Sequence, residues 1–204
     1  MSDESYLTNE HRWQRWEEVI KGVPNVRPAV KNTLLQLGQG IRCIEVGVAE
    51  GVNAKAILDL LQPSLLTLVD LWEDVVVQQG RNHPGDRYYA ASYEKCRLLL
   101  DFPQCEYMRG RSEEILPTLP ADSYDFAYID AAHDPQSVAT DTRNCIRLVR
   151  IGGIVGGDDY AITEPLQMIA LGVKQALGSL QSVKQDGYDW WVTVTPEIKE
   201  LINV

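Results

Sequence analysis

The chain has 204 residues, 45% of them hydrophobic, and is long enough to bury one full core without disulfide bonds. Its formal net charge of -10 disfavours binding to a nucleic-acid backbone or an anionic membrane, and no apolar run approaches the roughly 20 residues that span a bilayer. We therefore expect one domain over residues 1–204, with neither nucleic acid nor membrane as a partner.

The N-terminal part, residues 1–40, has two helical patterns, at about residues 10–21 and 28–37, separated by Gly22 and Pro24. We expect these helices to cap the mouth of a binding site. The first residues, MSDESYLTNEHRW, lack the basic start and the apolar stretch of a secretory signal. The cysteines also form no C-x-x-C pair, which predicts a cytoplasmic protein with reduced core thiols at Cys43, Cys96, Cys105 and Cys145.

From residue 41 onward, short apolar runs alternate with helical patterns. The runs predict strands at residues 41–47, 65–71, 105–108, 124–130 and 152–157. The helical patterns cover residues 52–61, 86–100, 135–149 and 163–177. Strands that alternate with helices form a parallel sheet covered on both faces.

Near the C-terminus, Asp186 and Gly187 stand between two strand-like runs, which predicts a hairpin and an antiparallel strand. The complete prediction is an α/β fold of the Rossmann-like, doubly wound type. Its sheet is mostly parallel and seven-stranded, with one antiparallel strand near the edge, N-terminal capping helices and a core over residues 41–195.

The stretch IEVGVAEGVNAKAIL leads the first strand into a loop with Gly47 and Gly51 and then into a helix. The glycines let the backbone approach a ligand closely. The dinucleotide pattern G-x-G-x-x-G is missing, and Glu45 at the strand end suits an amine-bearing ligand better than a diphosphate. The alternative is a strand-to-helix turn with two incidental glycines.

The second strand ends in LVDLW, which places Asp70 where a carboxylate can accept hydrogen bonds from ribose hydroxyls. Asp70 and the glycine loop together predict a nucleoside ligand. The alternative for Asp70 is an ordinary surface acid.

The loop EVGVAEG, the strand-end acid and the later stretch RGRSEEILPTLP together resemble class I S-adenosylmethionine-dependent methyltransferases. The resemblance implies that the glycine loop cradles the methionine part of the cofactor, that the acid holds the ribose and that residues after the third strand border the adenine. Position by position, it implies a cofactor site made by Glu45, Gly47, Gly51, Asp70, Leu71 and Ser112, with Asp130 at its border. For Leu71, a place in the core is the alternative.

Two further stretches, YIDAAHD and GGIVGGDDY, narrow the resemblance to metal-dependent O-methyltransferases of the catechol, caffeoyl-coenzyme A and antibiotic-tailoring types. Independently, neighbouring parallel strands about 4.8 Å apart would bring Asp130, Asp158 and Asp159 to one rim. Clustered carboxylates repel one another unless a cation lies between them. These acids therefore predict a site for Mg²⁺, with Mn²⁺ or Ca²⁺ as alternatives. A helix-capping turn is the competing interpretation of the acid pair.

His133 follows Asp130 by three residues, where the catechol and caffeoyl types carry a lysine that removes the acceptor proton. Histidine titrates near neutrality and can do the same work, so we expect Asp130 and His133 to be catalytic. A structural histidine at the next helix is the alternative. Segment 72–89, with Trp72, Arg81, Tyr88 and Tyr89, follows the second strand on the same rim and could shape the acceptor pocket.

The sequence thus predicts a Mg²⁺-dependent O-methyltransferase that acts on a hydroxyl of a small molecule and releases S-adenosylhomocysteine. Three alternatives stay open: a metal-independent methyltransferase, a non-catalytic cofactor-binding protein and a nicotinamide-dependent oxidoreductase. The acceptor is not identified by any motif, and a homodimer is left open.

Overall fold

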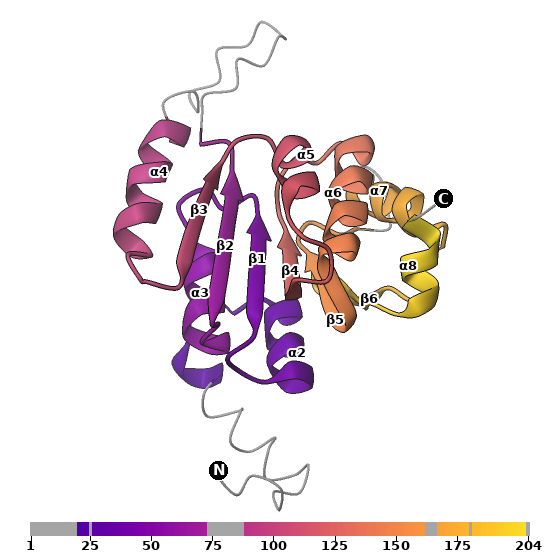
Figure 1. The fold of residues 1–204 in the computed structure, drawn as a ribbon, viewed down its shortest axis with the longest axis horizontal. Coiled ribbons are helices and arrows are strands. Elements are labelled where there is room, and N and C mark those ends of the chain that lie inside the picture. The colour runs from indigo at the N-terminus through magenta and orange to yellow at the C-terminus, as the bar shows by residue number, and fades with distance from the viewer. Residues whose placement is uncertain (1–19, 25, 73–87, 162–166, 180, 203–204) are drawn as a thin grey trace, which may run out of the picture.

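The structure is a computed structural model that describes residues 20–24, 26–72, 88–161, 167–179 and 181–202. Its centre is a seven-stranded sheet in the order β3-β2-β1-β4-β5-β7-β6 (Figure 1). The strands are β1 (Arg42–Val46), β2 (Leu65–Asp70), β3 (Cys105–Arg109), β4 (Tyr124–Ile129), β5 (Val149–Gly157), β6 (Lys184–Asp186) and β7 (Asp189–Thr193). Strands β1 to β5 pair in parallel, whereas β7 is antiparallel to both β5 and β6. The predicted fold class is confirmed, including the antiparallel strand next to the edge.

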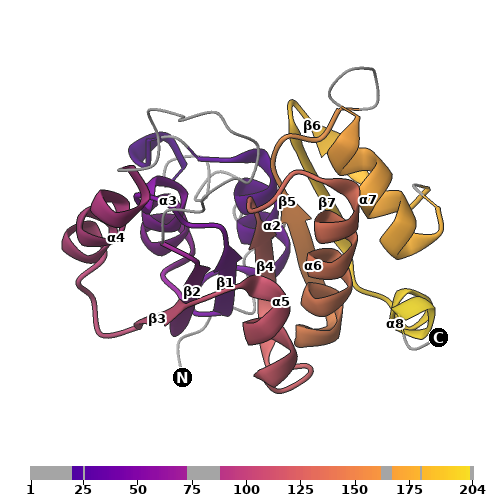
Figure 2. The same cartoon turned by 90° about the horizontal axis from the view of Figure 1, so that it is seen from above.

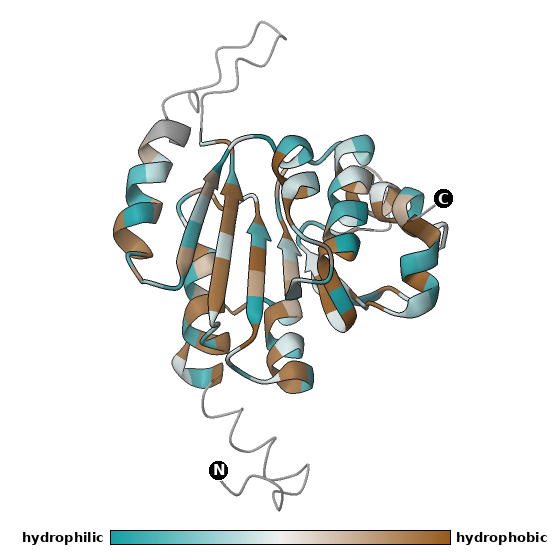
Figure 3. Ribbon diagram, viewed as in Figure 1, coloured by the Kyte–Doolittle hydropathy of each residue, from teal (hydrophilic) through white to brown (hydrophobic). Residues whose placement is uncertain are grey.

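Helices cover both faces of this sheet (Figure 2). One face packs against α2 (Pro28–Leu37), α3 (Val52–Leu61) and α4 (Tyr88–Leu99), and the other against α6 (Pro135–Leu148), α7 (Met168–Leu177) and α8 (Pro196–Ile202). The central strands are largely apolar, while the helices carry both apolar and polar stretches (Figure 3). The central strands β2 and β4 are mostly buried and apolar because helices cover both faces of the sheet there.

Some predicted boundaries were wrong. The fifth strand begins at Val149 and not at residue 152, because Val149 is extended and pairs with Tyr124. The preceding helix therefore ends at Leu148. The helix predicted over residues 163–177 is described only as α7, since residues 162–166 lie outside the described part. The sequence prediction also missed α8 and the short helical turns α5 (Ser112–Ile115) and η1 (Leu116–Thr118).

The N-terminal prediction is tested only in part, because residues 1–19 lie outside the described residues. The second predicted helix is present as α2, which packs on a face of the sheet through Ala29, Val30 and Leu34. The start of α2 lies at the rim, where the N–H of Ala29 donates to Asp189 of β7, and the predicted capping role of the N-terminal helices stays a prediction. None of the helices in the described ranges is long and apolar enough to cross a membrane.

The register of the parallel strands brings their carboxyl ends into one row. Val46 of β1 pairs with Val69 of β2 and with Ile129 of β4, and Ile129 in turn pairs with Gly157 of β5. The residues that follow these strands are therefore neighbours at one edge. The strand order also reverses between β1 and β4, and such a reversal is where open α/β sheets bind ligands.

Candidate active site

The loop after β1 lies against the end of β4. Gly47 has a φ of +84°, and a Cβ added to it would stand 2.0 Å from the carbonyl oxygen of Asp130. Gly51 also has a φ of +84°, and its Cβ would stand 3.0 Å from the Sγ atom of Cys96. Gly47 therefore leaves no room for a side chain, and the positive φ of Gly51 favours glycine there. The loop they shape leads directly into α3, which begins without a side-chain cap.

Asp70 ties this loop together from the end of β2. Its Oδ2 accepts hydrogen bonds from the backbone N–H groups of Val48, at 2.7 Å, and Ala49, at 2.9 Å. Its Oδ1 accepts one from the N–H of Trp72, also at 2.7 Å. Asp70 thus orders the loop after β1, and the predicted contact with a ribose would use the lone pairs of its carboxylate that these hydrogen bonds leave free.

Glu45 points from β1 into the covered side of the sheet and is 1% exposed. Its Oε1 accepts a hydrogen bond of 2.9 Å from Nδ2 of Asn53 in the first turn of α3. Its Oε2 and the Oδ1 of Asn53 are buried and have no hydrogen-bond partner among the described residues. Burial raises the pKa of Glu45 to about 8. Two unpartnered oxygen acceptors in one buried place are what a ligand ammonium group would satisfy.

Leu71 and Ser112 were the two residues predicted for the adenine side of the site. Leu71 is half-buried at the rim. Ser112 opens α5 and hydrogen-bonds with Asp141. Burial raises the pKa of Asp141 to about 6, although the hydrogen bond with Ser112 acts in the opposite direction. The hydroxyl of Ser112 is therefore engaged with α6.

Trp72 was expected to shape an acceptor pocket, and this was wrong. Its side chain is fully buried, donates from Nε1 to the carbonyl oxygen of Ala49 at 2.8 Å, and packs against Tyr93 and Tyr107. Of the other pocket candidates, Arg81 and the side chains of Tyr88 and Tyr89 lie outside the described part.

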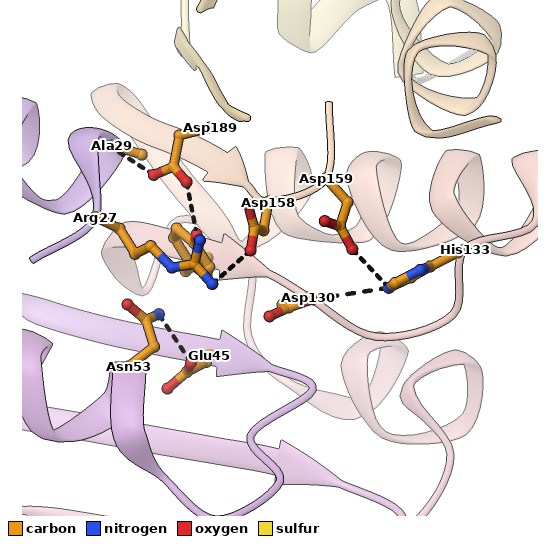
Figure 4. A network of polar contacts seen from close by, with 10 residues as sticks. Arg27, Ala29, Glu45, Asn53, Asp130, His133, Asp158, Asp159 and Asp189 are labelled. Atoms are coloured by element: carbon orange, nitrogen blue, oxygen red, sulfur yellow. Dashed lines mark hydrogen bonds and ion pairs between the residues drawn. The ribbon is translucent and has the colours of Figure 1, made fainter. Parts of the chain in front are cut away.

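An acidic cluster follows β4 and β5 (Figure 4). Nε2 of His133 lies 3.7 Å from Oδ1 of Asp130 and 3.5 Å from Oδ2 of Asp159. One ligand atom from each of these three residues lies within 4.8 Å of the others. Asp159 has a φ of +56°, a conformation unusual for a non-glycine residue that turns it toward His133.

Asp158 faces the other way. Its Oδ2 forms an ion pair of 2.5 Å with the guanidinium of Arg27, the residue before α2. Its Oδ1 is buried without a hydrogen-bond partner in the described structure. The three acids predicted as metal ligands do meet at one rim, where Arg27 lies on one side of Asp158 and Asp159 lies on the other (Figure 4).

The neighbouring charges shift the pKa values of the residues in this cluster. A hydrogen bond with Asp130 raises the pKa of His133, and the nearby charge of Asp159 raises it further. Burial and the charge of Asp158 raise the pKa of Asp159. Arg27 thus stands beside the acids as a cation, and His133 adds a second positive charge whenever it is protonated.

Sequence reasoning missed a buried network that positions Arg27. Asp189, the first residue of β7, is 1% exposed and accepts hydrogen bonds from the backbone N–H of Ala29 at 2.9 Å and from the hydroxyl of Tyr128 at 3.1 Å. An acid within the otherwise apolar run DWWV was the available signal. Arg27 itself had no sequence signal, because its ion-pair partner Asp158 follows β5 and is far away in the sequence.

The residues present fit a divalent cation. Carboxylate oxygens suit Mg²⁺ and Mn²⁺, and an imidazole is also a common ligand of transition metals. Asp130, His133 and Asp159 already lie close together, and Asp158 adds one buried, unpartnered oxygen. A pocket lined by Asp130, His133, Asp158, Val138 and Trp190 opens beside them.

Comparisons with known proteins agree with this geometry. A family model described as a methyltransferase domain matches residues 44–160 of the chain. A protein of Mycobacteroides abscessus named "Putative O-methyltransferase" is 31% identical over 145 residues. The matched part covers 69% of this chain but only 61% of that relative, so the chain spans less than two thirds of the relative's length.

Solved structures share the fold. The O-methyltransferase NovP is 20% identical, with a TM-score of 0.60 over 89% of this chain and 80% of its own. Cofactor-bound Rv0187 from MTB is 16% identical, with a TM-score of 0.57 over 95% of this chain and 94% of its own. At these identities the similarity establishes the architecture alone.

Proposed function

The chain belongs to the methyltransferase domain family, with the class I S-adenosylmethionine-dependent fold, and on that basis we propose that it methylates a hydroxyl group of a small molecule with the help of a bound divalent ion. One observation supports this proposal above the others. A buried acid with an unpartnered oxygen, Glu45, lies one strand away from the acid cluster of Asp130, Asp158 and Asp159. A site for an ammonium and a site for a divalent cation thus adjoin at one edge of the sheet.

The methyl donor would lie over the loop after β1. Glu45 and Asn53 would accept hydrogen bonds from the ammonium of its methionine end. Because Gly47 packs directly on the backbone at the end of β4, the loop stays close to the sheet and leaves room for a ligand to lie across it. Asp70 keeps the loop in one conformation, and Leu71 would lie beside the adenine.

Asp130 and Asp159 would hold the metal ion, with the free oxygen of Asp158 as the third carboxylate ligand. When bound, such an ion supplies Lewis acidity and fixes the orientation of the acceptor hydroxyl. These acids would therefore hold the ion where it can orient the acceptor, and its positive charge would offset the negative charge on the acceptor oxygen when the proton leaves.

His133 would remove that proton. Its side chain is 55% exposed at the rim and its Nε2 is directed toward the acids. In the reaction the bond between the methyl group and the sulfonium sulfur breaks, a bond from that methyl to the acceptor oxygen forms, and the hydroxyl proton passes to His133. S-adenosylhomocysteine is the second product.

A metal-independent methyltransferase is the second candidate, and a specific observation favours it. Arg27 already pairs with Asp158, and His133 lies close enough to Asp130 and Asp159 to pair with them when it is protonated. In that case the acids order the rim without a metal ion.

Calorimetry separates the two candidates. S-adenosylhomocysteine and then Mg²⁺ are titrated into the apo protein and into the variants Asp130→Asn, Asp159→Asn, Asp158→Asn and His133→Ala. We expect the three aspartate variants to lose the metal signal while they keep cofactor-product binding. His133→Ala should keep both signals and lose at least about 100-fold in turnover of a vicinal hydroxyl compound, as expected for a general base.

The control is Glu94→Gln, which removes one negative charge from the exposed face of α4, away from the cluster. It is needed because a chain of net charge -10 attracts cations without a specific site. Methyl transfer that survives a chelator would contradict the metal role, and loss of the metal signal in His133→Ala would make that residue a ligand instead of a base.

A further inference from the structure

The guanidinium of Arg27 is only partly used by its ion pair with Asp158. An arginine side chain offers five N–H donors in a planar fork, and Asp158 occupies one terminal nitrogen, NH2, at 2.5 Å. The side chain is 40% exposed, so part of the fork faces the open site. Asp158 is the only ion-pair partner of Arg27 among the residues that the structure describes.

Arg27 is also held in place, unlike most surface arginines. It directly precedes Pro28, whose ring restricts the backbone, and the next N–H, of Ala29, donates to the buried carboxylate of Asp189. Asp189 is in turn bound by Tyr128 of β4. The start of α2 is thus fixed to the sheet, and the guanidinium is confined to the space between β1 and β5.

Figure 4 shows what lies on the two sides of that space. Asp158 is on one side of the guanidinium, and Glu45 with Asn53 is on the other. Arg27 forms the ion pair with Asp158, and its charge also lowers the pKa of Glu45, although burial has the larger effect and raises it. The guanidinium therefore stands beside the two unpartnered oxygens that would take a ligand ammonium.

The methionine end of the donor carries a carboxylate next to its ammonium. With the ammonium at Glu45, this carboxylate would enter a place already surrounded by Glu45, Asp130 and Asp158. Like charges so close repel strongly unless a cation intervenes. A guanidinium binds a carboxylate by two parallel hydrogen bonds, and it can do so on a free edge while it keeps another carboxylate.

We propose that Arg27 binds the carboxylate of the donor's methionine end and so selects a complete amino-acid end over one that lacks the carboxylate. This inference rests on the proposed function. It assigns a binding role to a residue before the matched family region, which begins at residue 44.

The test compares two ligands in three proteins by calorimetry. The ligands are S-adenosylhomocysteine and its analogue without the carboxylate, 5′-deoxy-5′-(3-aminopropylthio)adenosine. The proteins are the unaltered chain, Arg27→Met and the control Lys31→Met, which removes an exposed positive charge from the same helix α2. We expect Arg27→Met to weaken S-adenosylhomocysteine about 10- to 100-fold, and to leave the analogue equal or slightly tighter.

Arg27→Lys should give an intermediate loss, because it keeps the charge without the planar fork. Urea unfolding of each variant verifies that the fold is intact. An equal loss for both ligands in Arg27→Met, or an unchanged affinity for S-adenosylhomocysteine in both arginine variants, would overturn the inference. If neither ligand binds the unaltered protein, the proposed function fails as well.

Discussion

Glu45 is a buried acid that is only partly satisfied by hydrogen bonds within the described residues. It is an acid in the interior of a sheet, with one oxygen bound to Asn53 and the other without a partner among the described residues. Burying an ionised carboxylate is costly, so the folded apo protein keeps Glu45 largely protonated at neutral pH. Such a residue is expensive for stability and is therefore better explained by a ligand than by packing.

The pH dependence of stability should reveal this cost. The pKa of Glu45 rises from its ordinary 4.5 to about 8 on folding, so between these values the folded chain holds a proton that the unfolded chain has lost. The free energy of unfolding should therefore fall as the pH rises through this window, by at most about 1.4 kcal/mol per pH unit from this group. Urea unfolding of the metal-free protein at several pH values between about 5 and 8 measures it.

Glu45→Gln provides the comparison, because glutamine has the same shape and does not titrate. The difference in unfolding free energy between the unaltered protein and this variant should decrease steadily with rising pH. A difference that is the same at every pH would show that Glu45 does not carry the buried proton. Other groups whose pKa is raised by folding, such as Asp141 and Asp189, contribute equally to both proteins, so their effect cancels in the difference.

At the scale of elements, the decisive feature is the contact between the loop after β1 and the end of β4. The parallel register pairs Val46 with Ile129, and the N–H of Asp130 donates to the carbonyl oxygen of Val46 at 2.7 Å. The loop must then turn away without a side chain in between. Glycine at position 47 is therefore required by packing as well as by its φ of +84°.

We expect Gly47→Ala to destabilise the fold by about 3 kcal/mol or more, because the new Cβ would overlap the backbone of Asp130 in a left-handed conformation. Gly178→Ala is the matched control. It has a φ of +68° and nothing within 4 Å of the added Cβ, so it should cost only about 1 kcal/mol. Equal losses for the two variants in urea unfolding would mean that the loop can move away from β4.

At the scale of the whole molecule, segments that are far apart in the sequence meet at the site. The N–H of Ala29 donates to Asp189 across a separation of 160 residues, and Tyr128 from the middle of the chain joins them. Through this network the C-terminal hairpin positions the N-terminal residue Arg27 over Asp158. The site is thus completed by parts of the chain on both sides of the matched family region.

Asp189→Ala should therefore weaken folding and ligand binding together. The change leaves two buried donors, on Ala29 and Tyr128, without an acceptor, at a cost of about 2–4 kcal/mol in unfolding free energy. Asp189→Asn should lose less, because its amide oxygen still accepts one bond. The exposed Asp186, in the same hairpin, serves as the control as Asp186→Ala. Stability equal to that of this control would contradict the role of Asp189.

Much of the fold was predictable from the sequence because it depends on local patterns. Short apolar runs between helical periods predicted the parallel sheet, and the pair Asp186 and Gly187 predicted the hairpin. The same logic predicted that Asp130 and Asp158 meet, since carboxyl ends of neighbouring parallel strands share one edge. Family membership also followed from residues that are close in sequence, in the glycine loop and at the strand ends.

Other features depended on contacts that no local pattern encodes. Only the tertiary structure showed that Asp70 binds the loop backbone, that Trp72 is core and that one oxygen of Asp158 pairs with Arg27. Periodicity reflects which side of an element is buried, so the sequence determined the layers, the strand ends and the residue types that reach the rim. The partner of each charged side chain was decided by packing between distant segments, because a buried charge must pair with whatever the folded chain brings beside it.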